Sequence, residues 1–314
     1  MLHQGRQASV NLFHHIAQQL AEKLPTRTRS YFLAFITGIL FAIARRRTVT
    51  TWLQAAQISD DDQRSFYHMP HIGRKSIPLF ENMLDIILEK LATVIDTATY
   101  IRITLDDSPT KRYGKKVEGA GYHHNPTSGK TNATLCYGHS WVVAALVIAH
   151  PLFGEISFPI AAELYLRQKE IDKLKDKYDR KFQTKSAMAV AMIKRLVPRF
   201  AMFEKKIEII VDGGYAKDTV LLPLGKLDKV VTITRLRRDV ALFLIPPKWA
   251  KPGRGRPRVY GDKIDLKSTV VSNDGWQFVE CRQYGKIVKE QVKEFVAASR
   301  LTKFKRFFNF AGHI

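Results

Sequence analysis

The chain has 314 residues, of which 45% are hydrophobic, so it is long enough to bury one large core or several small ones and belongs to the globular class. Its 51 Lys and Arg residues against 29 Asp and Glu residues give a formal net charge of +22, which favours a polyanionic partner. Two cysteines, Cys136 and Cys281, are too few for a disulfide scaffold or a Cys-rich zinc site, so we expect a reduced, cytoplasmic protein.

Apolar residues recur at three-to-four spacing from residue 9 to about residue 98, which predicts an all-α N-terminal region. The most apolar stretch, residues 31–44, covers only about two-thirds of the ~20 residues that a transmembrane helix needs. We therefore expect a core helix there and no membrane partner. The N-terminus has no apolar run followed by a small-residue cleavage site, so a secretory signal is not indicated.

Three arginines, Arg45, Arg46 and Arg47, precede a short predicted helix that begins near Thr48. A basic approach to a short helix is typical of a helix-turn-helix that reads DNA. The same arginines would equally stabilise the end of the preceding helix through its dipole. The sequence leaves both interpretations open.

From residue 99 the hydrophobic pattern changes to that of strands joined by Gly and Pro signals. A helix interrupts the strands and is predicted to be the crossover between the third and the fourth, which gives an α+β or α/β layer. The charged stretch before that helix is typical of a solvated helix face or a loop. The predicted strands are residues 101–105, 138–150, 154–166, 206–211 and 229–234, the helix is 184–200 and the charged stretch is 167–183.

Acidic residues directly follow two of the predicted strands: Asp106 and Asp107 follow the first, and Asp212 follows the fourth. Ligands bind outside the strand ends of open sheets, so pairing of the two strands would bring these acids together. Paired carboxylates suit Mg²⁺, and two such ions can clamp the oxygens of a phosphodiester. Alternatively, Asp107 begins an Asx turn and Asp212 caps the next helix.

Basic residues with candidate roles in DNA binding lie in two further places. Lys111 and Arg112 form a basic patch just beyond the first acids. In the Pro-, Gly- and Arg-rich segment after Arg235, Arg254 and Arg256 form the core of an AT-hook, followed by Arg258. In a protein this basic, a turn that touches phosphates without base preference is the simpler explanation.

The histidines His123, His124, His139 and His150 have no companion acid at ligand spacing, so we interpret them as structural or DNA-facing. Beyond the basic segment, short alternating stretches predict a small β-rich insertion.

Three blocks of the chain, residues 105–130, 137–165 and 211–218, resemble insertion-sequence transposases with a DDE catalytic domain, the DDE superfamily endonucleases. The similarity extends over residues 45 to 298. It implies an RNase H-like mixed sheet with strand order 3-2-1-4-5, in which strands one and four are neighbours. From the pattern and the resemblance together we expect four regions. They are a helical DNA-binding region (1–98), the first part of the catalytic core (99–235), a β-rich basic insertion (236–298) and a divergent basic tail (299–314).

The resemblance also implies the site. The family's first acid is the Asp directly before a Ser or Thr, which is Asp107 here, and the second is Asp212. Asp106 is the alternative to Asp107, although it should point to the opposite side of the strand. The implied cofactor is Mg²⁺ or Mn²⁺ held by Asp107 and Asp212. The implied partner is double-stranded DNA, both the transposon ends and the target. Assembly of several copies of the chain on that DNA is compatible with the sequence.

The family's third acid, a Glu on a helix after the insertion, has no counterpart here. Glu280, Glu290 and Glu294 lie in the β-like insertion and do not match the motif. We therefore expect a C-terminally truncated and inactive transposase. The alternative is a non-catalytic DNA-binding protein that inhibits transposition.

Overall fold

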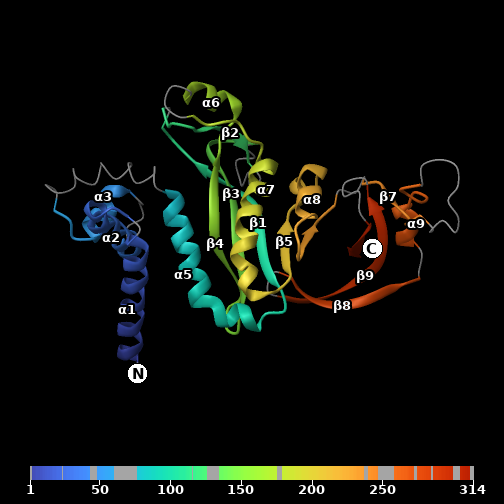
Figure 1. Ribbon diagram of the computed structural model, residues 1–314, viewed down its shortest axis with the longest axis horizontal. Coiled ribbons are helices and arrows are strands. Elements are labelled where there is room, and N and C mark those ends of the chain that lie inside the picture. The colour runs from blue at the N-terminus through green and yellow to red at the C-terminus, as the bar shows by residue number, and fades with distance from the viewer. Residues whose placement is uncertain are drawn as a thin grey trace. The chain divides into compact units, whose positions relative to one another are not determined.

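The computed structural model divides into two compact units, Met1–Ala98 with Phe158–Ala161, and Thr99–Ser157 with Ala162–Ile314. Helices form nearly all of the first unit, and the second contains the sheets (Figure 1). The residues that the structure describes are 2–22, 24–42, 48–59, 76–114, 116–125, 134–174, 179–236, 240–246, 258–271, 274–283, 286–299 and 305–311.

The N-terminal region is all-α, as predicted. Asn82 of the last of its helices donates from Nδ2 to the carbonyl of Gln19 at 2.7 Å, which ties that helix to the first. The described helices are α1 (Leu2–Ala21), α2 (Thr26–Phe41), α3 (Val49–Ala55) and α5 (Ser76–Thr97).

Helix α3 packs closely on α2. The rings of Phe35 and Trp52 meet edge to face with centroids 5.9 Å apart, and Leu53 is fully buried. A Cβ atom at Gly38 would lie 2.0 Å from the carbonyl oxygen of Trp52, so only glycine allows this approach. Thr48 caps α3, its Oγ1 accepting from the backbone N–H of Thr51 at 3.3 Å, which agrees with the predicted helix start.

The three arginines ahead of α3, Arg45, Arg46 and Arg47, lie outside the described residues. Their role in DNA binding, and the helix-turn-helix interpretation with it, stays a prediction.

The larger sheet has the order β2-β3-β1-β5-β6, and β4 also pairs with β3. Strand β1 is antiparallel to β3 and parallel to β5, which is in turn parallel to β6. Without the short β2, which sequence analysis missed, the order is the expected 3-2-1-4-5 of an RNase H-like sheet. The strands are β1 (Ile101–Lys111), β2 (Gly121–His124), β3 (Leu135–His150), β4 (Gly154–Tyr165), β5 (Ile207–Val211) and β6 (Val230–Thr234).

One face of this sheet is the core of the second unit. Strands β1 and β5 bury alternate residues, so that Ile103 and Ile209, which are paired in register, are both fully buried. Helix α7 (Lys185–Leu196) packs on β3 and on α8 (Asp218–Leu224). The other elements between the strands are α6 (Gln168–Leu174), the 3₁₀ helix η3 (Val197–Phe203) and the 3₁₀ turn η4 (Gly213–Tyr215).

Strand β1 does not end at Leu105, and that prediction is wrong. Its pairing with β5 stops at Leu105, opposite Val211, but its pairing with β3 continues to Lys111. The 16-residue β3 supplies partners along this whole length. Beyond Leu105, the strands that the structure describes pair with β1 on one side only, and such a strand tolerates Pro109.

A second sheet lies in the region expected to be a β-rich insertion. Strand β9 pairs with β8, β10 and β7, and β10 belongs to the segment interpreted as a divergent tail. Arg258 is exposed, whereas Arg254 and Arg256 lie outside the described residues. The elements are β7 (Leu242–Phe243), α9 (Leu266–Val271), β8 (Trp276–Gln283), β9 (Lys286–Ser299) and β10 (Lys305–Ala311).

The central position of β5 predicts a stability effect. Because Ile209 is fully buried, Ile209→Ala should lower the free energy of unfolding by about 2–5 kcal/mol in a urea titration. Ile233→Ala is the control: Ile233 is 44% exposed on β6, and its replacement should change that free energy by about 0.5 kcal/mol or less. Equal losses in the two variants would contradict the assigned core.

Candidate active site

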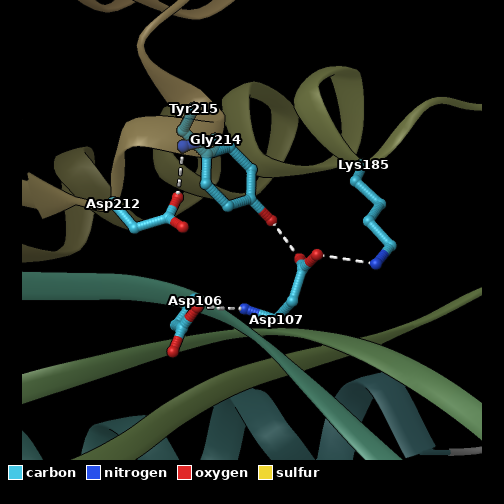
Figure 2. A network of polar contacts seen from close by, with 6 residues as sticks. All are labelled: Asp106, Asp107, Lys185, Asp212, Gly214 and Tyr215. Carbon is cyan, nitrogen blue, oxygen red and sulfur yellow. Dashed lines mark hydrogen bonds and ion pairs between the residues drawn. The ribbon is translucent and has the colours of Figure 1, made fainter. Parts of the chain in front are cut away.

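Strand pairing brings the predicted acids to one edge of the sheet. Leu105 of β1 is the register partner of Val211 of β5. Asp212 directly follows Val211. Asp107 lies two residues beyond Leu105, so side-chain alternation puts it on the same face of β1 as Leu105. The neighbouring strands therefore deliver both carboxylates to the same region of the core-facing side (Figure 2).

Asp107 is held by two side chains from other elements (Figure 2). The Tyr215 hydroxyl, from η4, donates to its Oδ1. The Lys185 ammonium, from the first residue of α7, donates to its Oδ2 at 2.6 Å. Asp107 lies within a strand, so the alternative that it begins an Asx turn does not describe its surroundings.

Asp212 caps the turn that carries Tyr215. Its Oδ1 accepts from the backbone N–H of Gly214 at 3.0 Å, and its carbonyl accepts from Thr234 Oγ1 of β6 at 3.1 Å. Within the described part of the chain its Oδ2 accepts no hydrogen bond. Asp212 is therefore a cap, as the alternative interpretation expected, but of η4 and not of α8. This role engages Oδ1 and leaves Oδ2 available.

Asp106 points to the other side of β1, as alternation predicts (Figure 2). Its Oδ1 accepts from the backbone N–H of Asp107 at 2.7 Å. Asp107, rather than Asp106, therefore shares a side with Asp212.

Tyr215 is the residue that sequence reasoning missed. It is buried, and burial raises the pKa of its phenol above the usual value. The hydrogen bond to Asp107 and the negative charges of Asp107, Asp212 and Asp106 raise that pKa further. The phenol thus stays protonated and donating amid three carboxylates. The available signal was its position three residues after Asp212.

The two carboxylates fit a divalent cation. Carboxylate oxygens are the ligands that Mg²⁺ prefers, and proteins commonly bind this ion through one or two carboxylates together with waters and phosphates. The ammonium on Asp107 Oδ2 shows that a positive charge is stabilised at this point. Over the residues that the structure describes, no group of three or more His, Cys, Asp or Glu side chains is arranged to hold a metal. Glu280, for example, lies on β8 and pairs with Lys289 at 3.4 Å.

An ion pair with a buried carboxylate lies in the stretch that we interpreted as a solvated helix face or a loop. Arg167 donates from Nε and Nη2 to the carboxylate of Glu170, at 2.7 and 2.5 Å, and from Nη1 to the carbonyl of Tyr122 at 3.0 Å. Glu170 is only 5% exposed. Although burial opposes its ionisation, the hydrogen bonds and charge of Arg167 hold its pKa below the usual value. Arg167 therefore joins β2 to α6.

The histidines have structural surroundings. His123 is buried, its Nε2 has no hydrogen-bond partner in the described part of the chain, and its ring lies 6.1 Å from that of Tyr165. His150 Nδ1 accepts from the N–H groups of residues 152 and 153 at 3.2 Å. His124 is exposed.

The basic patch beyond the acids is accessible. Lys111 ends β1 and is exposed, as is Arg112. Arg112 donates from Nε to His139 Nδ1 at 3.3 Å, and His139 Nε2 lies 2.9 Å from the carbonyl of Glu118. Two positive side chains thus follow Asp107 on the same strand and its extension.

The family model of the DDE superfamily endonucleases matches residues 19–292 of the chain. The chain belongs to this family. Enzymes of the DDE superfamily generally use divalent metal ions, and membership indicates a nuclease- or transposase-type activity with DNA as the substrate. A search of the curated proteins gave no match to this chain. Among its described residues, no helix has both the length and the apolar character needed to cross a membrane.

Burial of His123 predicts a pH dependence. Burial, followed by the charges of Lys185 and Arg167, lowers its pKa below the usual value. The unfolded chain then binds the proton first, so stability should fall as the pH drops from about 6.5 through the lower folded pKa. His123→Gln should flatten this part of a plot of urea midpoint against pH. His124→Gln, at the exposed neighbour, should leave the slope unchanged. If His123→Gln also leaves the slope unchanged, His123 is not the cause of the pH dependence.

Proposed function

We propose that this chain is an inactive form of an insertion-sequence transposase, in which Asp107 and Asp212 hold a divalent ion, Mg²⁺ or Mn²⁺, against a DNA phosphodiester. The observation that carries the proposal is that Asp107 and Asp212 lie just beyond the last paired residues of β1 and β5, Leu105 and Val211, with Tyr215 and Gly214 fixing one oxygen of each acid. Family membership supplies the class of substrate.

The chain's own residues would do most of the positioning. Tyr215 orients Asp107 by donating to Oδ1, and the N–H of Gly214 orients Asp212. A bound divalent ion supplies Lewis-acid stabilisation of phosphodiester oxygens. Preorganised carboxylates of this kind lose little freedom on binding the ion, which favours a defined geometry for attack by water or a 3′-hydroxyl.

DNA would be held by the basic residues outside the acid pair. Lys111 and Arg112 extend from the strand that carries Asp107, and Arg258 is exposed. The sequence adds Arg45, Arg46, Arg47, Arg254 and Arg256 to this set, and the helical residues 1–98 as a further DNA-binding region. The transposon ends, the target duplex and a homo-oligomer on DNA belong to the same proposal.

The alternative function, a non-catalytic DNA-binding protein that inhibits transposition, is favoured by one observation. The proposed ligands are two carboxylates, and among the described residues no group of three or more His, Cys, Asp or Glu side chains could hold a metal ion. Two-metal phosphoryl transfer needs enough anionic oxygens for ions about 3.5–4 Å apart, so a second ion would lack a principal protein ligand.

The metal assignment is tested by binding of Mn²⁺ to the 314-residue chain, measured by calorimetry. Asp107→Asn and Asp212→Asn should each weaken binding by about 100-fold, since loss of even an outer-shell partner costs about 10–100-fold. Asp106→Asn, which keeps an oxygen for the N–H of Asp107, should change it by less than about threefold. Equal weakening of Mn²⁺ binding by all three variants would contradict the assignment of Asp107 rather than Asp106 as the ligand from β1.

A cleavage assay tests the expected inactivity of the chain. With two carboxylates, we expect the 314-residue chain to bind DNA in a salt-dependent way, because phosphate neutralisation releases counterions, and not to nick labelled duplex with Mg²⁺ or Mn²⁺. Asp212→Ala provides the comparison. Robust cleavage that disappears in Asp212→Ala would reject the inhibitor and show that another group replaces the third acid.

A further inference from the structure

Lys185 lies where the proposed metal site needs a cation. Its Nζ is 2.6 Å from Asp107 Oδ2, the oxygen that Tyr215 does not engage. It also lies 5.3 Å from the ring centroid of Tyr165. A carboxylate and an aromatic face both stabilise a positive charge, so the ammonium occupies a position built for a cation.

The helix that carries Lys185 does not favour a positive charge there. Lys185 is the first residue of α7, directly after the cap Thr184, whose Oγ1 accepts from the N–H of Ala187 at 3.1 Å. Helix N-termini carry a partial positive charge and favour acidic side chains. Asp107, rather than α7, is therefore what retains the ammonium at this place.

The ion pair is also exchangeable. The side chains of Lys185 and Asp107 are 30% and 34% exposed, so ions from solvent reach them. The contact is a single hydrogen bond from a flexible point charge. The pair Arg167–Glu170 provides the contrast, because it is bidentate and Glu170 is 5% exposed, as expected of a permanent structural contact.

We propose that Lys185 is a positioning residue that holds Asp107 in the metal-free site, yields Oδ2 to the divalent ion, and then contacts a backbone phosphate of the bound DNA. The inference rests on the proposed function, in which Asp107 is a metal ligand. No bond is made or broken in this exchange. One cation replaces another at Asp107, and the released ammonium remains beside the carboxylates, where the phosphate would lie.

The exchange is tested by calorimetry with Mn²⁺ and the whole chain. Lys185→Met should bind Mn²⁺ about two- to fivefold more tightly than wild type, since the ion no longer competes with an ion pair of this exposed kind. Lys185→Arg restores the positive charge and should return the affinity towards the wild-type value. Lys194→Met removes an exposed lysine from the same helix and controls for long-range charge effects.

Binding of duplex DNA at saturating Mn²⁺ is the second measurement. Lys185→Met should weaken it and reduce the slope of log affinity against log salt by about 1, as expected for one lost phosphate contact. A variant that failed to fold would lose both kinds of binding. Tighter metal binding together with weaker DNA binding is therefore a signature that a merely structural lysine would not give.

Two outcomes would overturn the inference. If Lys185→Met binds Mn²⁺ no more tightly than Lys194→Met does, while Asp107→Asn still loses the metal, Lys185 does not compete for the site and the metal assignment stands. If Asp107→Asn and Asp212→Asn bind Mn²⁺ like wild type, the proposed metal site and the exchange at Lys185 both fail.

Discussion

The parallel pairing of β1 with β5 is the constraint on which the site depends. Five residues on each strand are paired in register, and alternate pairs are buried on the core face. A shift of one residue would turn Asp107 to the side that Asp106 now occupies and would expose Ile103. The free energy of burying these strands therefore also fixes which carboxylate stands beside Asp212.

Concentrated negative charge in a very basic chain is the second feature of the site. The charges of Asp107, Asp212 and Asp106 all raise the pKa of Tyr215, although the chain as a whole carries a formal charge of +22. The surrounding positive charge draws a polyanion towards the protein, while the carboxylates repel its phosphates locally. A cation between acid and phosphate resolves this conflict, and Lys185 and a divalent ion are the two candidates that the geometry offers.

Sequence analysis predicted the parts of the fold that depend on long apolar periods. The strands and the crossover helix α7 followed from buried strands and a helical repeat, whereas the strand order and the choice of Asp107 over Asp106 followed from the family resemblance. The resemblance selected the family. Sequence analysis failed where tertiary contacts decide: β1 passes Leu105 because β3 continues to pair with it. That partner is not visible from local pattern, and Lys185 and Tyr215 likewise reach Asp107 from about 80 to 110 residues away.

Strand β1 extends beyond the end of its pairing with β5, and Asp106 lies in this extension. Past Leu105 the strand has no parallel neighbour among the described strands, so an amide on that side is unpaired, as on a sheet edge. Asp106 covers the amide of Asp107 with its own carboxylate oxygen. A foreign strand that tried to extend the sheet here would have to break that hydrogen bond and bury a charge. The hydrogen bond that Asp106 makes thus disfavours the addition of a strand at this edge, while Asp107 faces Lys185 and Tyr215.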